Sequence, residues 1–355
     1  MPKKTTFFSK KLISWYLQNK RDLPWRNTTE PYFIWLSEIL LQQTRVAQGL
    51  PYYVKFVKRF PTVKNLADAS EDEVLKLWQG LGYYSRARNL HSTARYITEE
   101  LGGKFPTTHA ELLRLKGVGD YTASAIASLS FQVPAAVVDG NVYRVLSRVF
   151  GIETPINASK GIKEFKTLAQ ALIDKSQPGI YNQAIMEFGA RFCVPQNPDC
   201  NACIFKDICE ANRLNKVSVL PVKSKKQKIR KRYFNYMVLL SEDNKTMLQQ
   251  RKGKGIWQKL YEFPLLESTS EIHPNQLNKW QPYLDFSKKF DSYSTSLYNE
   301  TSVIHKLSHQ HLYTRFWIVE AAPLDDLGIP LSEISNYAVP VLIENFISDF
   351  YRMKN

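Results

Sequence analysis

Four cysteines lie within seventeen residues of this 355-residue chain, with the spacing Cys193-x6-Cys200-x2-Cys203-x5-Cys209. Four thiolates this close together can surround one tetrahedral metal ion or one cubane iron–sulfur cluster. A zinc ribbon usually has two C-x2-C pairs, whereas this chain has one pair with longer arms on either side. The spacing therefore favours a [4Fe–4S] cluster held by the loop 193–209, with zinc and four unligated thiols as the alternatives.

The position of all four cysteines in one loop also indicates in which cellular compartment the protein works. A disulfide-stapled secreted protein spreads its pairs over a small chain, so a metal cluster in a reducing compartment fits better. No run approaches the ~18 apolar residues that cross a bilayer, and Lys10 and Lys11 interrupt the apolar N-terminus. We expect no membrane association and a cytoplasmic location, nucleoid-associated if the source is bacterial.

The charge of the chain is strongly positive. Its 48 Lys and Arg residues against 33 Asp and Glu give a formal net charge of +15, which attracts polyanions before any specific contact forms. The 44% hydrophobic content excludes a wholly disordered chain. We expect a globular protein that acts as a monomer on nucleic acid.

Composition and periodicity divide the chain into two domains. Residues 1–216 show apolar spacings of three and four, which predict helices, among them one over residues 31–48. Residues 217–232 include seven basic residues in ten and no acid from Lys223 to Arg232, so we interpret them as a basic linker. Residues 233–355 predict a separate α+β domain that begins with a β-hairpin over 232–252, contains a strand over 311–321 and closes with a helix over 339–353.

Two glycines, Gly117 and Gly119, stand directly before an Ala/Ser-rich helical segment that starts at Tyr121. Glycine permits a tight turn and a close backbone approach, so the amide groups at the helix start can hold a phosphate oxygen. On its own the pattern fits a plain turn between helices better than a phosphate anchor. In a basic helical domain it favours a helix-hairpin-helix anchor for the DNA backbone.

Six further motifs accompany the cysteine loop. They are L-P-W-R (23–26), S-E-I-L-L-Q-Q-T-R-V (37–46), G-L-G-Y-Y-S-R (80–86), L-K-G-V-G-D-Y-T (115–122), V-V-D-G-N-V-Y-R-V-L-S-R (137–148) and N-Q-A (182–184). Together they resemble the helix-hairpin-helix DNA glycosylases of the endonuclease III superfamily, and specifically the A/G-specific adenine glycosylases of the MutY family. The resemblance is strong over residues 20–210. It implies a mostly α helix-hairpin-helix glycosylase domain with an iron–sulfur cluster loop, followed by an α+β Nudix-like domain.

Hydrolysis of an N-glycosidic bond needs an acid for the leaving base and an anion for the cationic sugar. Glu38 lies in an apolar helical segment that raises a carboxyl pKa, whereas Asp139 precedes a helix whose N-terminus favours the ionised form. Alone, the two residues fit an exposed helix glutamate and an ordinary N-cap. The resemblance implies that Glu38 is the general acid and that Asp139 stabilises the sugar cation.

Two neighbouring residues bear on the reaction type. Tyr121 stands where the bifunctional glycosylase/lyases of the superfamily have a lysine that forms a Schiff base, which a phenol cannot form. Asn141 stands where the pyrimidine-lesion enzymes usually have a histidine. The resemblance therefore implies hydrolysis without lyase chemistry, with Tyr121 and Asn141 supporting Asp139.

The resemblance also implies binding residues. Arg26 and Gln183 would line the adenine pocket, although a surface arginine and a helix-face glutamine are the alternatives. The target base must leave the duplex, so side chains must fill the gap. The residues assigned beside that gap are Gln43, Thr44, Leu81 and Tyr83, the phosphate anchors are Gly117 and Gly119, and the residues that contact 8-oxoguanine are Ser308 and His309.

Three departures from the family pattern matter. Leu307 stands where relatives have a phenylalanine before the Ser-His pair, so the stacking part of that contact is weakened. Residues 233–355 lack the R-E-x-x-E-E core of a Nudix hydrolase, so this domain should bind without hydrolysing. The segment 194–199 has no basic residue and one acid, which argues against phosphate contact by the cysteine loop.

The sequence thus predicts a monofunctional DNA glycosylase of base excision repair, which removes adenine mispaired with 8-oxoguanine or guanine in double-stranded DNA. An endonuclease III-like oxidised-pyrimidine glycosylase/lyase is the first alternative, since it shares the hairpin and the cysteine spacing. A non-catalytic DNA-damage or redox-sensing module is the second.

Overall fold

The computed structural model describes residues 2–224, 229–321 and 328–354. The chain forms two compact units, and each is described by itself: Met1–Ala69 with Asn89–Lys225, and Ser70–Arg88 with Lys226–Asn355. No helix in the described part of the chain is long and apolar enough to cross a membrane.

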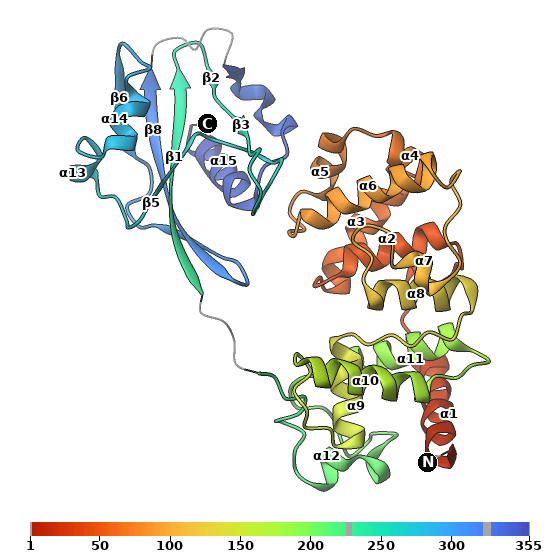
Figure 1. Ribbon diagram of the computed structural model, residues 1–355. Helices are drawn as coiled ribbons and strands as arrows, with labels where there is room; N and C mark the ends of the chain where they lie inside the picture. Colours follow the sequence, from red (N-terminus) through yellow and green to blue (C-terminus); the bar gives the residue numbers. More distant parts are fainter. Residues whose placement is uncertain (1, 225–228, 322–327, 355) are drawn as a thin grey trace. The chain divides into compact units, whose positions relative to one another are not determined.

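The first unit consists of helices and their connections (Figure 1), as the sequence predicts. In chain order these are α1 (Pro2–Asn19), η1 (Pro24–Arg26), α2 (Pro31–Leu41), α3 (Val46–Arg59), α4 (Val63–Asp68), the greater part of α6 (Ser85–Glu99), α7 (His109–Leu112), α8 (Asp120–Phe131), α9 (Gly140–Phe150), α10 (Ser159–Leu172), α11 (Pro178–Arg191), η2 (Lys206–Ile208) and α12 (Glu210–Arg213). The helix expected over 31–48 is instead two helices. The chain breaks after α2 because Gln43 has φ +54°, a conformation that an α-helix cannot contain.

One apolar core joins the N-terminal helix to the cysteine loop. Its buried members come from α1, α8, α9, α10 and α11. The Phe8 ring of α1 stacks on Phe205, which lies between two of the cysteines, at 4.6 Å between centroids. Phe188 of α11 meets the same ring edge-on at 5.3 Å. Aromatic packing therefore anchors the loop to the helices.

The second unit is built on a mixed five-stranded sheet in the order β5-β1-β8-β6, with β7 also paired to β8. Its strands and helices are α5 (Glu71–Trp78), β1 (Arg230–Ser241), β2 (Lys245–Thr246), β3 (Gln249–Gln250), β4 (Tyr261–Glu262), β5 (Leu265–Ser268), α13 (Pro274–Leu277), α14 (Gln281–Ser287), β6 (Tyr293–Leu297), β7 (Val303–Lys306), β8 (Gln310–Ala321), β9 (Ile329–Pro330), η3 (Leu331–Asn336) and α15 (Val341–Lys354). The long central strands β1 and β8 run parallel through its middle (Figure 1).

Helices cover both faces of that sheet. On one face Met237 and Trp317 pack with Tyr283 of α14. On the other face Phe316, the residue before Trp317, stacks on Phe346 of α15 at 4.0 Å. Successive residues of a strand point to opposite faces, so both faces of β1 and β8 are buried, which explains their nearly continuous apolar sequences.

The expected hairpin over 232–252 is wrong. A tight turn does follow β1, with Asn244 at φ +56°, but β1 pairs with β5 and β8, and β2 pairs with β9. β8 pairs with β1 along its whole length, β5 pairs with residues 233–236 on the other edge, and β2 pairs with β9 instead of with β1. The strand expected over 311–321 and the closing helix are confirmed as β8 and α15.

The segment Ser70–Arg88 contacts the C-terminal part of the chain within the second unit. Lys259 forms an ion pair with Glu71 at 2.7 Å, and the Val339 amide donates to the Gln79 side chain at 3.3 Å. The domain limits 1–216, 217–232 and 233–355 stay a prediction. Strand β1 begins inside the expected linker, because Arg230 already pairs with Gln310, and residues 225–228 of that linker lie outside the described residues.

Candidate active site

Two carboxylates from different helices line one cavity of about 160 Å³ in the first unit. Glu38 lies on α2 and Asp139 is the N-cap of α9. Tyr121, in the first turn of α8, and Asn141, in the first turn of α9, line the same cavity. The structure thus brings together the four residues that the sequence assigns to catalysis, although they are up to about a hundred residues apart in the chain.

The Glu38 side chain is buried. Burial raises the pKa of its carboxyl to about 7; a hydrogen bond with Tyr121 opposes the shift and the nearby charge of Asp139 adds to it. Burial is the largest effect because a carboxylate loses its hydration when water is excluded. At neutral pH a large fraction of Glu38 is therefore protonated and able to donate, as the sequence predicts.

Asp139 has more hydrogen-bond donors than Glu38. The Val142 amide donates to Oδ1 at 2.8 Å and the Asn141 side chain donates to Oδ2 at 2.7 Å. The net pKa shift differs from the expectation, because burial raises the pKa of Asp139 more than these hydrogen bonds and the Arg144 charge lower it. The helix N-terminus is one contribution among several, and desolvation outweighs it.

Tyr121 faces Glu38 from α8. Its hydroxyl interacts with the Glu38 carboxyl and donates to Sδ of Met186 at 3.2 Å. Burial and the nearby charges of Glu38 and Asp139 hold the pKa of the phenol well above its usual range. Tyr121 is therefore a neutral hydroxyl in this cavity. No lysine is found among the described residues that line this cavity or its wider opening, so the site contains no amine for a Schiff base.

Arg26 and Gln183 also line the cavity, as expected. The sequence analysis did not identify the side chains that bind Arg26 and Gln183. Glu187 is fully buried and pairs with Arg26 at 2.7 Å and with Arg21 at 2.6 Å. Tyr16 donates to Gln183 at 2.8 Å. A glutamate within the apolar stretch of α11 was the available signal, since a buried carboxylate needs a partner.

A wider cavity of about 930 Å³ opens from the same residues. Gln43, Thr44 and Gly119 line it together with Glu38 and Asp139. Gln43 has φ +54°, a strained conformation for a residue with a side chain. Gly119 is the N-cap of α8, whose amide groups therefore begin at this opening.

Gly117 is the strained glycine of the hairpin. Its φ is +80°, and a Cβ added there would lie 2.8 Å from the Cβ of Asn89. Gly119 has φ −92° and open space around it. The turn therefore needs glycine at position 117 because of its positive φ. At position 119 the lack of a side chain leaves open space at the N-terminus of α8.

Leu81 and Tyr83 belong to the second unit, between α5 and α6. Leu81 is buried, whereas Tyr83 is 48% exposed and has φ +49°. The Arg86 guanidinium lies 5.6 Å from the Tyr83 ring centre. The exposed half of the Tyr83 ring is available for contacts outside the unit, whereas its neighbour Tyr84 is buried.

Ser308 and His309 form the turn between β7 and β8, and both are exposed. The Ser308 hydroxyl lies 3.3 Å from Nδ1 of His309.

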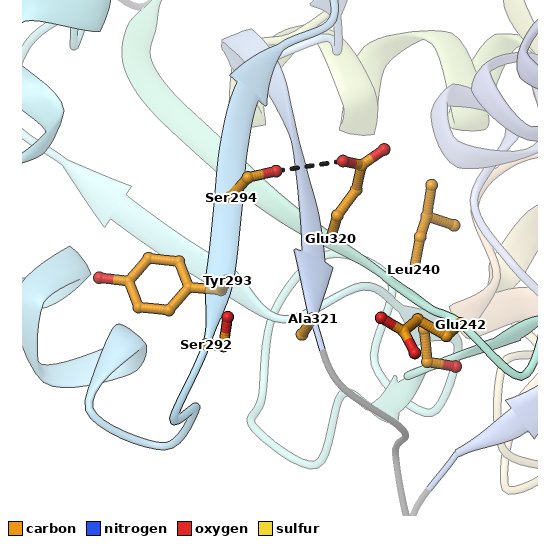
Figure 2. A pocket seen from close by; sticks show the side chains of 8 residues that line it. Leu240, Glu242, Ser292, Tyr293, Ser294, Glu320 and Ala321 are labelled. Atoms are coloured by element: carbon orange, nitrogen blue, oxygen red, sulfur yellow. Dashed lines mark hydrogen bonds between the residues drawn. The ribbon is translucent and has the colours of Figure 1, made fainter.

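A polar pocket of about 450 Å³ lies at the other end of β8, where Ser294 donates to Glu320 at 3.1 Å (Figure 2). Its charged lining residues, Glu242 and Glu320, are both acidic, so this pocket is unsuited to a phosphate.

The four cysteines are free and half-buried. Burial and the neighbouring thiol charges raise the pKa of Cys200 and Cys209, and that of Cys203 to about 11. The Phe205 amide donates to Sγ of Cys203 at 3.4 Å. Among the described residues no group of three or more His, Cys, Asp or Glu side chains is arranged to hold a single metal ion.

Two arginines of α9 form hydrogen bonds with the cysteine loop. Arg148 donates to the carbonyls of Val194 and Pro195 at 2.7 and 3.0 Å and lies 3.5 Å from Sγ of Cys193. Arg144 donates to the Cys193 carbonyl at 2.7 Å. These arginines hold the loop in place, but with Arg148 buried and its donors bound to carbonyls they do not replace the basic residues that 194–199 lacks for phosphate contact.

Comparisons with known proteins agree with this architecture. The HhH-GPD superfamily of base excision DNA repair proteins matches residues 36–180, and the NUDIX domain matches residues 235–349. A solved thermostable thymine-DNA glycosylase is 31% identical, with a TM-score of 0.56 over 60% of this chain and 98% of that one. A solved endonuclease III–DNA complex, at 22% identity and a TM-score of 0.52 over 61% of this chain and 98% of that one, shares the fold of the helical unit.

Full-length relatives are similar as well. An adenine DNA glycosylase of Buchnera aphidicola subsp. Baizongia pistaciae is 36% identical over 319 residues, which are 89% of this chain and 87% of that protein. An adenine DNA glycosylase of Homo sapiens is 48% identical over 218 residues, 59% of this chain and 40% of the human protein. The chain therefore belongs to the adenine DNA glycosylase family of base excision repair enzymes.

Proposed function

We propose that this chain is a monofunctional glycosylase that releases adenine mispaired with 8-oxoguanine or guanine in double-stranded DNA. The observation that carries the proposal is the pairing, in one cavity, of a Glu38 carboxyl whose pKa is raised to about 7 with an Asp139 carboxylate that accepts two hydrogen bonds. One group can give a proton to the leaving base, and the other can stabilise positive charge on the sugar.

The reaction proceeds by proton transfer and bond cleavage. Glu38 donates its proton to a ring nitrogen of adenine, and the electron pair of the glycosidic bond leaves with the base. The Asp139 carboxylate stabilises the resulting oxocarbenium-like sugar, with Asn141 and Tyr121 fixing the two carboxyl groups. Water then adds to the sugar carbon and gives a proton to the Glu38 carboxylate, which restores the acid.

The nucleotide must leave the duplex before this chemistry begins, at a cost of roughly a few kcal/mol. In the first unit we assign Gln43 and Thr44 to the gap that it leaves. In the second unit we assign Tyr83 to this task, with the buried Leu81 as a support of its loop. The positive φ of both Gln43 and Tyr83 supports this assignment, because strained non-glycine residues concentrate at functional sites. Gly117 and Gly119 would let the start of α8 approach a phosphate.

The exposed turn between β7 and β8 is the proposed contact with 8-oxoguanine. Ser308 and His309 both present polar atoms to the surface at this turn. A hydroxyl and an imidazole can hydrogen-bond to the edge of an oxidised purine. The second unit would thus read the base opposite adenine.

We further propose that Cys193, Cys200, Cys203 and Cys209 hold a [4Fe–4S] cluster. Four free thiols in one loop, with the Phe205 amide donating to Sγ of Cys203 and the Arg148 guanidinium 3.5 Å from Sγ of Cys193, suit the thiolates of a polynuclear cluster. The single C-x2-C pair with longer arms also favours a cluster over mononuclear zinc. When bound, such a cluster would stabilise the fold of the loop.

The test is a single-turnover assay on duplexes that contain adenine opposite 8-oxoguanine or guanine. The wild-type chain should release adenine, and Glu38→Gln should lose at least 10²-fold in rate, because general acid catalysis is worth about 10² to 10⁴. Lys64→Gln, which alters an exposed ion pair on α4, is the matched control. Borohydride trapping of a covalent DNA adduct would instead support the glycosylase/lyase alternative.

A further inference from the structure

An acidic residue stands at the helix start that we assign to a DNA phosphate. Asp120 is the first residue of α8, directly after Gly119, and its side chain is 54% exposed. It also lines the wider opening beside Glu38 and Asp139. A helix N-terminus attracts anions, but a carboxylate already placed there repels a phosphate that approaches the same amide groups. The proposed anchor is therefore weakened unless a cation cancels the charge of Asp120.

Lys166 of α10 supplies that cation. Its Nζ donates to Oδ2 of Asp120 at 2.7 Å and to Oγ of the buried Ser124 at 3.0 Å. Nε2 of His109, on α7, lies 3.3 Å from Oδ1 of the same carboxylate. Two elements thus face Asp120, and the ammonium group of Lys166 balances its formal charge.

The same ammonium group reaches the segment that leads to Asp139. Its third hydrogen bond goes to the Ala136 carbonyl at 2.9 Å. Ala136 is buried and lies three residues before Asp139. Gln170, one turn further along α10, accepts from the Ala136 amide at 3.0 Å and donates to the Pro134 carbonyl at 2.6 Å. Two side chains of α10 therefore bind the backbone of this segment.

Asn182 of α11 holds the segment from another side. It is fully buried, accepts from the Val137 amide at 3.2 Å and donates to the Ala135 carbonyl at 2.8 Å. Residues 134–137 belong to no helix or strand, so these side chains satisfy backbone groups that a regular element would otherwise pair. The placement of Asp139 depends on these contacts, and the contact made by Lys166 links it to the first turn of α8.

We propose that Lys166 is a positioning residue that cancels the charge of Asp120 at the phosphate anchor and holds that anchor in register with the segment that carries Asp139. The inference rests on the proposed function and specifies how duplex binding at α8 is linked to the placement of the catalytic carboxylate. The two effects are separable. The first depends on charge, and the second depends on the hydrogen bond to the Ala136 carbonyl.

The experiment compares Lys166→Met, Asp120→Asn and the double variant in two measurements. The Kd for an undamaged duplex reports phosphate contact without chemistry, because such binding does not depend on sequence. The single-turnover rate on a duplex with adenine opposite 8-oxoguanine, at saturating enzyme, reports the placement of the catalytic groups. Melting temperatures show which variants are folded at the assay temperature.

Lys166→Met should fail in both measurements. Its uncompensated Asp120 carboxylate should weaken duplex binding about fivefold or more at low salt, since two like charges a few ångström apart repel by about 1 kcal/mol even in water. The loss should shrink as salt screens the charge. The rate at saturation should fall about tenfold, because misplacement of a reacting group by about 1 Å can cost about 10² in rate.

The double variant separates charge from position. With the carboxylate removed as well, duplex affinity should return to near the wild-type value. The rate at saturation should stay low, because the Ala136 carbonyl still lacks its donor. Asp120→Asn alone leaves the Lys166 charge beside the phosphate, so it should bind the duplex more tightly than the wild-type chain. This variant tests the charge effect even if Lys166→Met does not fold.

The matched control is Lys163→Met, which removes the same charge from an exposed position of α10 and should keep the wild-type rate. The charge effect is overturned if Lys166→Met binds as tightly as Lys163→Met, if the double variant stays weak, or if Asp120→Asn loses affinity. The positioning effect is overturned if Lys166→Met keeps its rate at saturation or if the double variant regains it. Failure of the wild-type chain to release adenine would instead defeat the proposed function, while the comparison of duplex affinities would stand.

Discussion

The Asn141 side chain donates a 2.7 Å hydrogen bond to one oxygen of Asp139, whose other oxygen caps helix α9 through the Val142 amide. One carboxylate therefore has two separable tasks. It closes the first turn of a helix, and it places a negative charge in the cavity. Substitutions at this position can remove the charge and keep the cap, or remove both.

Asp139→Asn should slow adenine release strongly and leave the fold intact. Asparagine caps a helix about as well as aspartate, but it offers no charge to an oxocarbenium-like sugar, and removal of such stabilisation costs about 10² to 10³ in rate. Asp139→Ala should be equally slow and less stable than Asp139→Asn by about 1 kcal/mol. Urea unfolding and single-turnover rates measure the two effects, and equal stability of the two variants would contradict the capping role.

Glu38→Gln should be inactive and yet more stable than the wild-type chain at alkaline pH. The folded-state pKa of Glu38 is raised to about 7 from an ordinary 4.5, so folding favours its protonated form. The associated stability is present below pH 4.5 and is lost as pH rises through about 7. The loss is on the order of 3 kcal/mol. Denaturant unfolding of both proteins at pH 6 and pH 9 should show this gap widening with pH, and a constant gap would refute the assignment.

The wild-type rate of adenine release should follow the same ionisation. The protonated acid is the active form, so the single-turnover rate should be highest below pH 7 and fall about tenfold per pH unit well above it. At low pH Asp139 becomes protonated and loses its charge, so the rate should fall again at the acidic limit of the profile. A rate that rises steadily up to pH 9 would show that Glu38 is not the proton donor.

The two hairpin glycines should respond differently to alanine. Gly117→Ala forces a Cβ to 2.8 Å from Asn89 at φ +80°, so it should destabilise the chain by at least about 1 kcal/mol. Gly119→Ala meets nothing within 4 Å and has an ordinary φ, so it should fold normally. Any loss of duplex affinity in Gly119→Ala then reports a close phosphate approach. Similar melting temperatures for the two variants would contradict the backbone argument.

The sequence was sufficient for much of the site because local rules govern its parts. Periodicity predicts the helix around Glu38, and the position of Asp139 before an apolar-periodic segment predicts a cap. The resemblance predicts that both face one cavity, which no local rule can do. The direction of the pKa shift of Asp139 was not predicted correctly, because it depends on burial by helices that are distant in the chain.

The errors share a physical cause, which is long-range pairing. Nothing in the local sequence shows that β8, some seventy residues after β1, would occupy the edge that a hairpin partner needs. The clamp of Glu187 on Arg21 and Arg26 likewise joins residues more than 160 apart. Such contacts depend on the tertiary fold, and only the buried position of a charged residue hints at them.

The support of the cysteine loop by Arg148 yields the last prediction. Arg148 is 2% exposed and donates to three carbonyls, those of Val194, Pro195 and Leu220. Arg148→Met should leave these carbonyls unpaired and lower cluster affinity by about 10- to 100-fold, as loss of outer partners does at metal sites. Arg213→Met is the control, since Arg213 makes only an exposed ion pair with Glu210 in the described part of the chain. Iron content per chain after dialysis against a chelator should fall in Arg148→Met alone; equal retention in both variants would show that the loop holds its group without this arginine.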